Sequence, residues 1–175
     1  MGKSPRHHDI TPAQCRAARA MLRLTQPELG RLAGLSRDVI VRLEGGGSGL
    51  HYTTPGLIEA ALASQGVTLI LDEMGHGVRL NRNPPASQKM LAAEILAPAQ
   101  CRAARGLLGL TVRNLEKLAR VHKKQLLHTF EEETGLPSPP VLMRLRASLV
   151  ANGVWFRNEL SFVSAQTRIR EPAGS

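Results

Sequence analysis

A phrase of fifteen residues occurs twice in the chain, 86 positions apart. The first copy, TPAQCRAARAMLRLT, begins at Thr11, the second, APAQCRAARGLLGLT, begins at Ala97, and eleven of the fifteen positions are identical. Farther along, one extra residue in the second copy changes the offset to 87, so that Glu44 aligns with Glu131. Two diverged copies of one unit of about 70 residues account for this pattern. Because two copies are too few for a solenoid, we expect each copy to have its own small core.

The repeat also divides the chain into regions. We expect a first domain over residues 10–81 and a diverged second domain over residues 96–170. They are joined by a linker over residues 82–95, which contains two adjacent prolines and several polar side chains. A flexible basic arm over residues 1–9 and a short tail over residues 171–175 complete the predicted organisation.

Local signals within the first copy favour helices. Thr11 followed by proline is a typical helix N-cap with proline in the first turn. Thr25 with Glu28 three residues later predicts a capping box at the start of a second helix. Gly34 suits the left-handed residue that ends this helix. Ser36 is placed to cap a third helix, and a Thr-Pro pair predicts the start of a fourth.

Each copy ends with a signal for paired β-strands. In the first copy, VTLIL at residues 67–71 precedes a turn and VRL at residues 78–80, which predicts a β-hairpin. In the second copy, the stretch that begins with GVWFRNELSFV at residue 153 resembles a strand pair. The predicted fold class is therefore mainly α, with two tandem helical domains that each carry a C-terminal β-hairpin extension.

Charge and cysteine content narrow the class of protein. The net charge of +9 and the pI of 10.7 point to a polyanionic partner, either nucleic acid or anionic lipid. No uninterrupted apolar run approaches about 18 residues and no signal peptide is found, so we expect a cytoplasmic, nucleoid-associated protein with no membrane partner. Cys15 and Cys101 occupy equivalent positions, and free thiols are favoured over the alternative of a disulfide between them.

No cluster of residues indicates catalysis or a bound cofactor. The histidines are scattered, and neither copy has the cysteine and histidine spacing typical of a zinc site. The sequence has no paired carboxylates, nucleophile elbow or nucleotide-binding motif above chance. We therefore expect no enzyme activity, no metal and no cofactor.

The stretch LTQPELGRLAGLSRDVIVRLEGG, from residue 24 to residue 46, predicts two short helices around a tight turn that contains glycine. In a helix-turn-helix unit of this geometry the second helix lies in the major groove of DNA. The stretch resembles the Cro/C1-type (XRE) helix-turn-helix family of phage-repressor-like regulators, well over about 55 residues of the first copy and more loosely in the second. The resemblance rests on Leu24, Thr25, Gln26, Glu28, Leu29, Gly34, Leu35, Ser36, Ile40, Glu44 and Gly46.

The resemblance implies roles for particular side chains of the first copy. Gln26 would contact a DNA phosphate together with the amides of its helix N-terminus. Arg37 suits the O6 and N7 acceptors of guanine, and Asp38 suits the N4 amino group of cytosine. The alternative for Arg37 and Asp38 is that they form a solvated first turn of the helix with no partner. Glu44 is expected to have a structural role and not to contact DNA. The DNA-contacting set implied for the first copy is Gln26, Ser36, Arg37, Asp38, Val41, Arg42, Gly47 and Ser48.

The second copy differs where these contacts are expected. Val112 replaces Gln26, and two glutamates, Glu132 and Glu133, stand where the first copy has a glycine-rich loop. Carboxylates beside phosphates weaken binding to DNA. A basic face remains, however, and its candidate DNA-contacting residues are Lys123, Lys124, Gln125 and His128. Two alternatives are open for this copy: an altered DNA-contacting module, which is favoured, or a dimerisation or protein-contact module.

These expectations define a bacterial sequence-specific transcriptional regulator that binds double-stranded DNA at an operator with two half-sites. A homodimer formed through the hairpins or the second domain remains an alternative assembly. The competing functions are a protein-interaction regulator of the antiactivator or antitoxin-like kind and a non-specific nucleoid protein.

Overall fold

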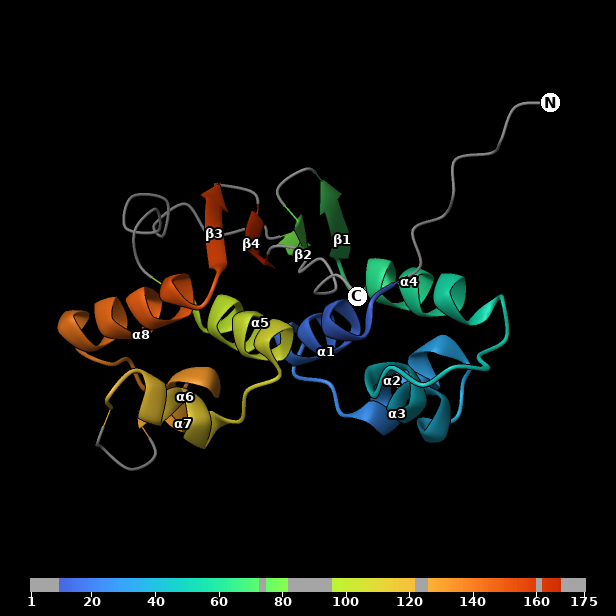
Figure 1. The fold of residues 1–175 in the computed structure, drawn as a ribbon, viewed down its shortest axis with the longest axis horizontal. Coiled ribbons are helices and arrows are strands. Elements are labelled where there is room, and N and C mark those ends of the chain that lie inside the picture. The colour runs from blue at the N-terminus through green and yellow to red at the C-terminus, as the bar shows by residue number, and fades with distance from the viewer. Residues whose placement is uncertain (1–9, 73–74, 82–95, 122–125, 160–161, 168–175) are drawn as a thin grey trace, which may run out of the picture.

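The computed structural model describes residues 10–72, 75–81, 96–121, 126–159 and 162–167. These residues form eight helices and one four-stranded antiparallel sheet (Figure 1). The expected arm (1–9), linker (82–95) and tail (171–175) lie outside the described residues. None of the helices described is long and apolar enough to cross a membrane.

The elements of the first repeat begin and end where its capping residues predict. The Thr11 hydroxyl accepts a hydrogen bond from the backbone N–H of Gln14 at 3.1 Å, and Thr25 forms the expected capping box with Glu28. Gly34 ends the second helix with a φ of +66°, in the left-handed region that glycine adopts without steric cost. The elements are α1 (Pro12–Met21), α2 (Gln26–Ala33), α3 (Arg37–Glu44), α4 (Thr54–Ser64), β1 (Val67–Asp72) and β2 (Gly75–Asn81).

The second repeat follows the same order with altered caps. Its first helix begins after Ala97, which has no hydroxyl, yet the Ala97 N–H still donates to Oε1 of Gln100 at 3.0 Å. In the first repeat Thr11 and Gln14 form a complete capping box, with the Thr11 N–H donating to Oε1 of Gln14 at 3.0 Å. The second repeat therefore retains half of this capping box. The elements are α5 (Pro98–Leu108), α6 (Val112–Leu118), α7 (Leu126–Glu131), α8 (Pro139–Ala151), β3 (Val154–Glu159) and β4 (Phe162–Thr167).

The two strand pairs join into a single sheet with the order β1-β2-β4-β3. At its centre Val78 of β2 faces Ala165 of β4, and these two residues are equivalent positions of the two repeats. The flanking pairs exchange partners in the same way, because Gly77 faces Gln166 and Arg79 faces Ser164. Such reciprocal pairing is the mark of a twofold interface. Within one chain, the two repeats are thus related by a pseudo-twofold axis that passes between β2 and β4.

The first helices of the two repeats pack against each other beneath this sheet (Figure 1). They approach closely, because a Cβ added to Gly106 of α5 would lie 2.7 Å from the Cα of Ala17 in α1. Each helix is also bonded to the sheet through an equivalent glutamine. The side-chain amide of Gln14 donates to the carbonyl of Gly77 at 3.2 Å, and that of Gln100 donates to the carbonyl of Ser164 at 3.2 Å.

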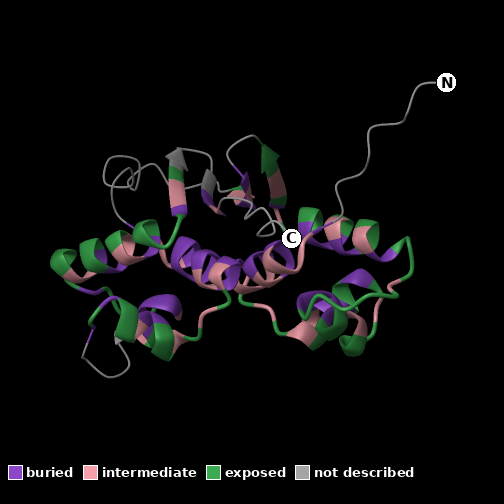
Figure 2. Cartoon of the chain, in the orientation of Figure 1, coloured by how far each residue is buried: buried purple, intermediate pink, exposed green. Residues whose placement is uncertain are grey.

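The expectation of two separate cores is wrong. The buried apolar side chains form one continuous cluster that runs from the first repeat through α1 and α5 into the second. Figure 2 shows this buried centre along α1 and α5, with the exposed surface on the outer helices. The physical reason is that small residues on α1 and α5 let the two helices meet, so each repeat completes the other's core.

Candidate nucleic-acid interface

The pair α2 and α3 is held at a fixed angle by close packing at the turn. Leu29 of α2 and Ile40 of α3 are fully buried. Gly30 permits the close approach, because a Cβ there would lie only 2.7 Å from the carbonyl oxygen of Leu35. Any larger residue would force the two helices apart. Nothing in the sequence pattern marked Gly30, since it lies inside a helix and away from the turn.

The outward side of α3 and the loop after it carry most of the residues predicted to contact DNA. The Arg37 and Asp38 side chains are 61% and 85% exposed, and the contact between them, 3.8 Å long, is too exposed to hold them in place. Val41, Arg42, Gly47 and Ser48 are also exposed, as is Ser36 at the N-cap, whose side chain makes no capping hydrogen bond. These side chains are therefore free to meet a partner.

Gln26 makes a contact within the protein that the sequence did not indicate. Its side-chain amide donates to Oε2 of Glu44 at 2.9 Å, which orients the side chain at the start of α2. A phosphate contact by Gln26 would therefore be made by a group already held in position.

Glu44, at the end of α3, is the centre of a buried polar network. Arg19 of α1 donates to both carboxylate oxygens, at 2.7 and 2.9 Å, and this bidentate hydrogen bonding raises the pKa of Arg19. Burial, with a smaller effect from the nearby Glu44, raises the pKa of the Cys15 thiol to about 12. The network fixes α3 against α1, in agreement with the structural role expected for Glu44.

The second repeat reproduces this network almost atom for atom. Arg105 of α5 donates to the two oxygens of Glu131 at 3.0 and 2.9 Å, and it also donates to the carbonyl of Leu110. Burial raises the pKa of the Cys101 thiol well above its usual value. Val112 occupies the position of Gln26, however, so the side-chain amide that meets Glu44 has no counterpart at Glu131. Both cysteines are free thiols, as predicted.

The surface of the second repeat departs from that of the first. His128 of α7 is exposed, whereas Lys123, Lys124 and Gln125 lie outside the described residues. The two glutamates that follow α7 face arginines. Glu132 pairs with Arg23 of the first repeat, and Glu133 pairs with Arg102. The acids that replace the glycine-rich loop are therefore engaged by the protein itself, which reduces the repulsion they would exert on a phosphate.

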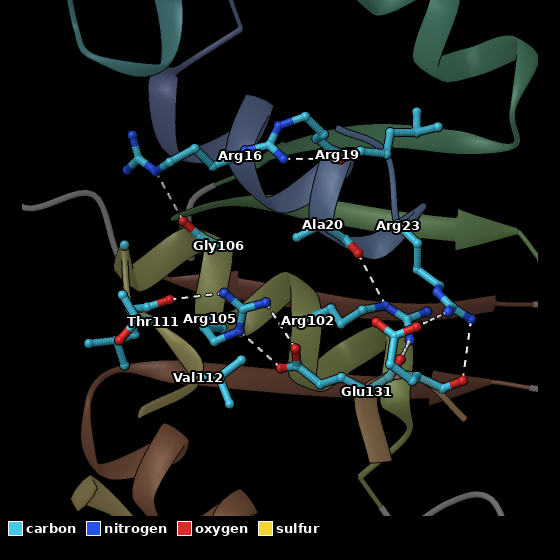
Figure 3. A pocket seen from close by; sticks show the side chains of 14 residues that line it. Arg16, Arg19, Ala20, Arg23, Arg102, Arg105, Gly106, Thr111, Val112 and Glu131 are labelled. Atoms are coloured by element: carbon cyan, nitrogen blue, oxygen red, sulfur yellow. Dashed lines mark hydrogen bonds and ion pairs between the residues drawn. The ribbon is translucent and has the colours of Figure 1, made fainter. Parts of the chain in front are cut away.

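A cleft of about 530 Å³ lies between the two repeats, at the C-terminal ends of α1 and α5 (Figure 3). Carboxylates pair with four of its five arginines, while Arg16 donates to backbone carbonyls. We call the boundary where α1 and α5 meet the seam. In Figure 1, α2 and α3 lie on one side of this seam and α6 and α7 lie on the other, and all four helices are on the side of α1 and α5 away from the sheet. The arginines that line the cleft are Arg16, Arg19, Arg23, Arg102 and Arg105.

Comparison of the chain with protein-family models and with curated proteins gives no match. Within the described parts of the chain, no group of three or more histidine, cysteine, aspartate or glutamate side chains is placed to hold a metal ion.

Proposed function

We propose that the chain is a sequence-specific DNA-binding regulator in which two helix-turn-helix repeats act as a covalent pseudo-dimer. The observation that carries this proposal is the pseudo-twofold axis between β2 and β4, which relates the α2–α3 pair of one repeat to the α6–α7 pair of the other. Dimeric helix-turn-helix regulators bind two half-sites about 34 Å apart through such an axis. In this chain both halves belong to one molecule.

In the first repeat, α3 is the proposed recognition helix. Arg37 and Asp38, both exposed in its first turn, would contact base edges in the major groove. Gln26, oriented by Glu44, and the backbone at Gly47 would contact phosphates on either side. This arrangement assigns sequence readout to α3 and positioning to the residues around it.

The second repeat is proposed as a second, altered DNA-contacting module. Its framework matches the first, with Arg105 and Glu131 in the places of Arg19 and Glu44. The exposed surface differs, so its preferred half-site would differ from that of the first repeat. We accordingly propose an operator with two unlike half-sites, bound in a single orientation by a cytoplasmic, nucleoid-associated protein that has no enzyme activity and no cofactor.

The test is selection of bound duplexes from random DNA, followed by affinity measurements with Arg37→Ala. We expect a defined consensus, a loss of about 1–3 kcal/mol in binding free energy, and relaxed preference at one base pair. Arg144→Ala is the matched control, because Arg144 is an exposed arginine on α8, away from the proposed recognition helix. Equal affinity for all duplexes would contradict specific binding, and unchanged specificity in Arg37→Ala would contradict the role of Arg37.

A protein-interaction regulator is the second candidate function, and one observation favours it. Leu136 and Met143 of the second repeat are 78% and 71% exposed, whereas the equivalent positions of the first repeat are Gly49 and Gly56. Exposed apolar side chains are common at protein-binding surfaces. Undiminished regulation by the double variant Arg37→Ala, Asp38→Ala, together with its loss in Met143→Ser, would favour this candidate over DNA readout.

A further inference from the structure

Two equivalent arginines connect each repeat to the other on the side of the molecule away from the sheet. Arg16 of α1 donates through Nε to the carbonyl of Gly106 in the second repeat, at 3.3 Å. Arg102 of α5 donates through Nε to the carbonyl of Ala20 in the first repeat, at 3.1 Å. Both contacts are visible in Figure 3. Because Arg16 and Arg102 are equivalent, as are Ala20 and Gly106, the pseudo-twofold axis interchanges these two contacts.

The same guanidinium groups also hold the ends of α3 and α7. Nη1 of Arg16 donates to the backbone carbonyl of Glu44 at 2.5 Å, and Nη1 of Arg102 donates to the backbone carbonyl of Glu131. Each carbonyl belongs to the last residue of its helix, where carbonyl groups lack a partner within the helix and carry partial negative charge. One arginine thus joins the end of a proposed recognition helix to the first helix of the opposite repeat.

The rigidity of these two connections follows from their chemistry and burial. A guanidinium group is planar and presents its donors in a fixed fork, so two simultaneous bonds restrict both the distance and the angle between the groups that accept them. Arg102 is 6% exposed and donates also to the carbonyl of Met21, at 3.2 Å, and to Glu133. In contrast, the ion pair between Arg23 of the first repeat and Glu132 of the second is exposed on both sides and is screened by salt.

We propose that Arg16 and Arg102 are positioning residues that set the separation and relative rotation of α3 and α7, and hence the spacing between the half-sites that the chain accepts. This inference rests on the proposed function. The sheet and the contact of α1 with α5 fix the frameworks of the two repeats, whereas the arginines fix the ends of the helices that read DNA. The ligand is thereby specified as duplex DNA with two half-sites at one spacing.

The geometry of DNA makes binding sensitive to the number of base pairs between the two half-sites. One added base pair moves a half-site by about 3.4 Å and rotates it by about 34°, since a helical turn takes about 10–10.5 base pairs. A molecule whose two proposed DNA-reading helices are held by the half-buried fork of Arg16 and the buried fork of Arg102 cannot follow this change without breaking contacts in one half-site. A molecule without the forks has more freedom to do so.

The test compares the selected operator with versions that have one base pair added or removed between the half-sites. Arg16→Lys and Arg102→Lys keep the positive charge but replace the fork with a single ammonium group, and Arg144→Lys on α8 is the matched control. We expect the wild-type chain and the control to lose at least about tenfold in affinity when the spacing changes. The two seam variants should lose less than about threefold, with the larger relaxation in Arg102→Lys.

Three outcomes are distinguishable. A wild-type chain with no sequence preference would overturn the proposed function and, with it, this inference. A wild-type chain that discriminates spacing, with variants that discriminate equally, would overturn the inference alone. Relaxed spacing in the seam variants, with a consensus within each half-site unchanged, would support both.

A second measurement tests the positioning role without DNA and guards against loss of folding in Arg102→Lys. Spin labels on Asp38→Cys and His128→Cys, both at exposed positions of α3 and α7, report the distance between these helices. A narrow distance distribution in the otherwise wild-type chain and a broader one in Arg16→Lys are expected. Equal widths would overturn the positioning role of Arg16.

Discussion

The two repeats share most of their buried polar contacts, whereas their exposed surfaces have diverged. Inside, each repeat has a glutamine bonded to the sheet, a buried cysteine, and an arginine paired through two bonds with the last residue of its third helix. Outside, glycines in one repeat stand where the other has Glu132 and Glu133, and Gln26 stands where the other has Val112.

This difference separates two kinds of constraint within one chain. The internal residues meet partners that both repeats share, so a change at one of them leaves a buried group without its partner. The surface residues meet solvent or an external partner, so they are free to change with the ligand. The positions that both repeats share therefore maintain the fold, and under the proposed function the altered positions would determine what each repeat binds.

The largest expected effect comes from the buried carboxylates. Glu44→Gln and Glu131→Gln each leave a partly buried arginine without its counter-charge, and we expect each to lower the free energy of unfolding by about 3 kcal/mol or more. Urea denaturation measures the effect, with Glu116→Gln on α6 as the control expected to change stability by less than about 0.5 kcal/mol. A large loss in one repeat with none in the other would contradict the equivalence of the two networks.

The second largest effect on stability is expected where α1 and α5 cross. Gly106→Ala places a Cβ against the backbone of Ala17, so we expect a loss of about 1–3 kcal/mol in the free energy of unfolding. Gly56→Ala in α4 is the matched control, because a Cβ there meets open space. That control should stabilise the protein by about 0.5–1 kcal/mol, since alanine favours a helix. Equal effects of the two changes would show that the helices do not approach as closely as described.

The buried thiols predict a decline in stability at alkaline pH. The pKa of Cys15 is raised from 9.0 to about 12 in the folded protein, and that of Cys101 is raised as well, in both cases chiefly by burial. The folded state keeps these protons where the unfolded state releases them, so stability is lost as the pH rises from about 9 to about 12.

Urea midpoints at pH 8 and pH 10.5 measure this loss. Changing both Cys15 and Cys101 to alanine should reduce the difference between the two midpoints while lowering stability at pH 8. Rapid modification of either thiol by an alkylating reagent in the folded protein would contradict their burial.

The exposed pair across the seam has the smallest expected effect. Arg23→Gly copies Gly109, the equivalent residue, and removes the contact with Glu132 while keeping a residue suited to the left-handed backbone found at both positions. We expect a change in unfolding free energy of less than about 1 kcal/mol. The difference from wild type should shrink further in high salt, because the pair is exposed. A larger, salt-independent loss would make Arg23 part of the rigid connection.

Much of the local structure follows from the sequence. The N-caps at Thr11 and Thr25, the left-handed Gly34 and both strand pairs lie where local signals place them, because each depends on residues close together in the chain. The structural role of Glu44 follows from its charge, which would be repelled by a phosphate.

The contacts between the repeats could not be predicted in the same way. The pairing of β2 with β4 joins strands far apart in sequence, and nothing in either strand says which edge meets which. The acceptors of Arg16 and Arg102 in the opposite repeat are backbone carbonyls. Because every residue type has a backbone carbonyl, the sequence does not indicate which residues accept these bonds. One signal was present: both arginines lie within the repeated phrase, and an exposed arginine would not need to be the same in two copies that diverged elsewhere.

The most direct test of the account is a footprint of the selected operator combined with the mass of the complex in solution. We predict that one chain protects two unlike half-sites, with centres about ten base pairs apart on one face of the duplex. Two chains on one operator, each covering one copy of the same half-site, would contradict the covalent pseudo-dimer. That result would mean that only the first repeat contacts the bases.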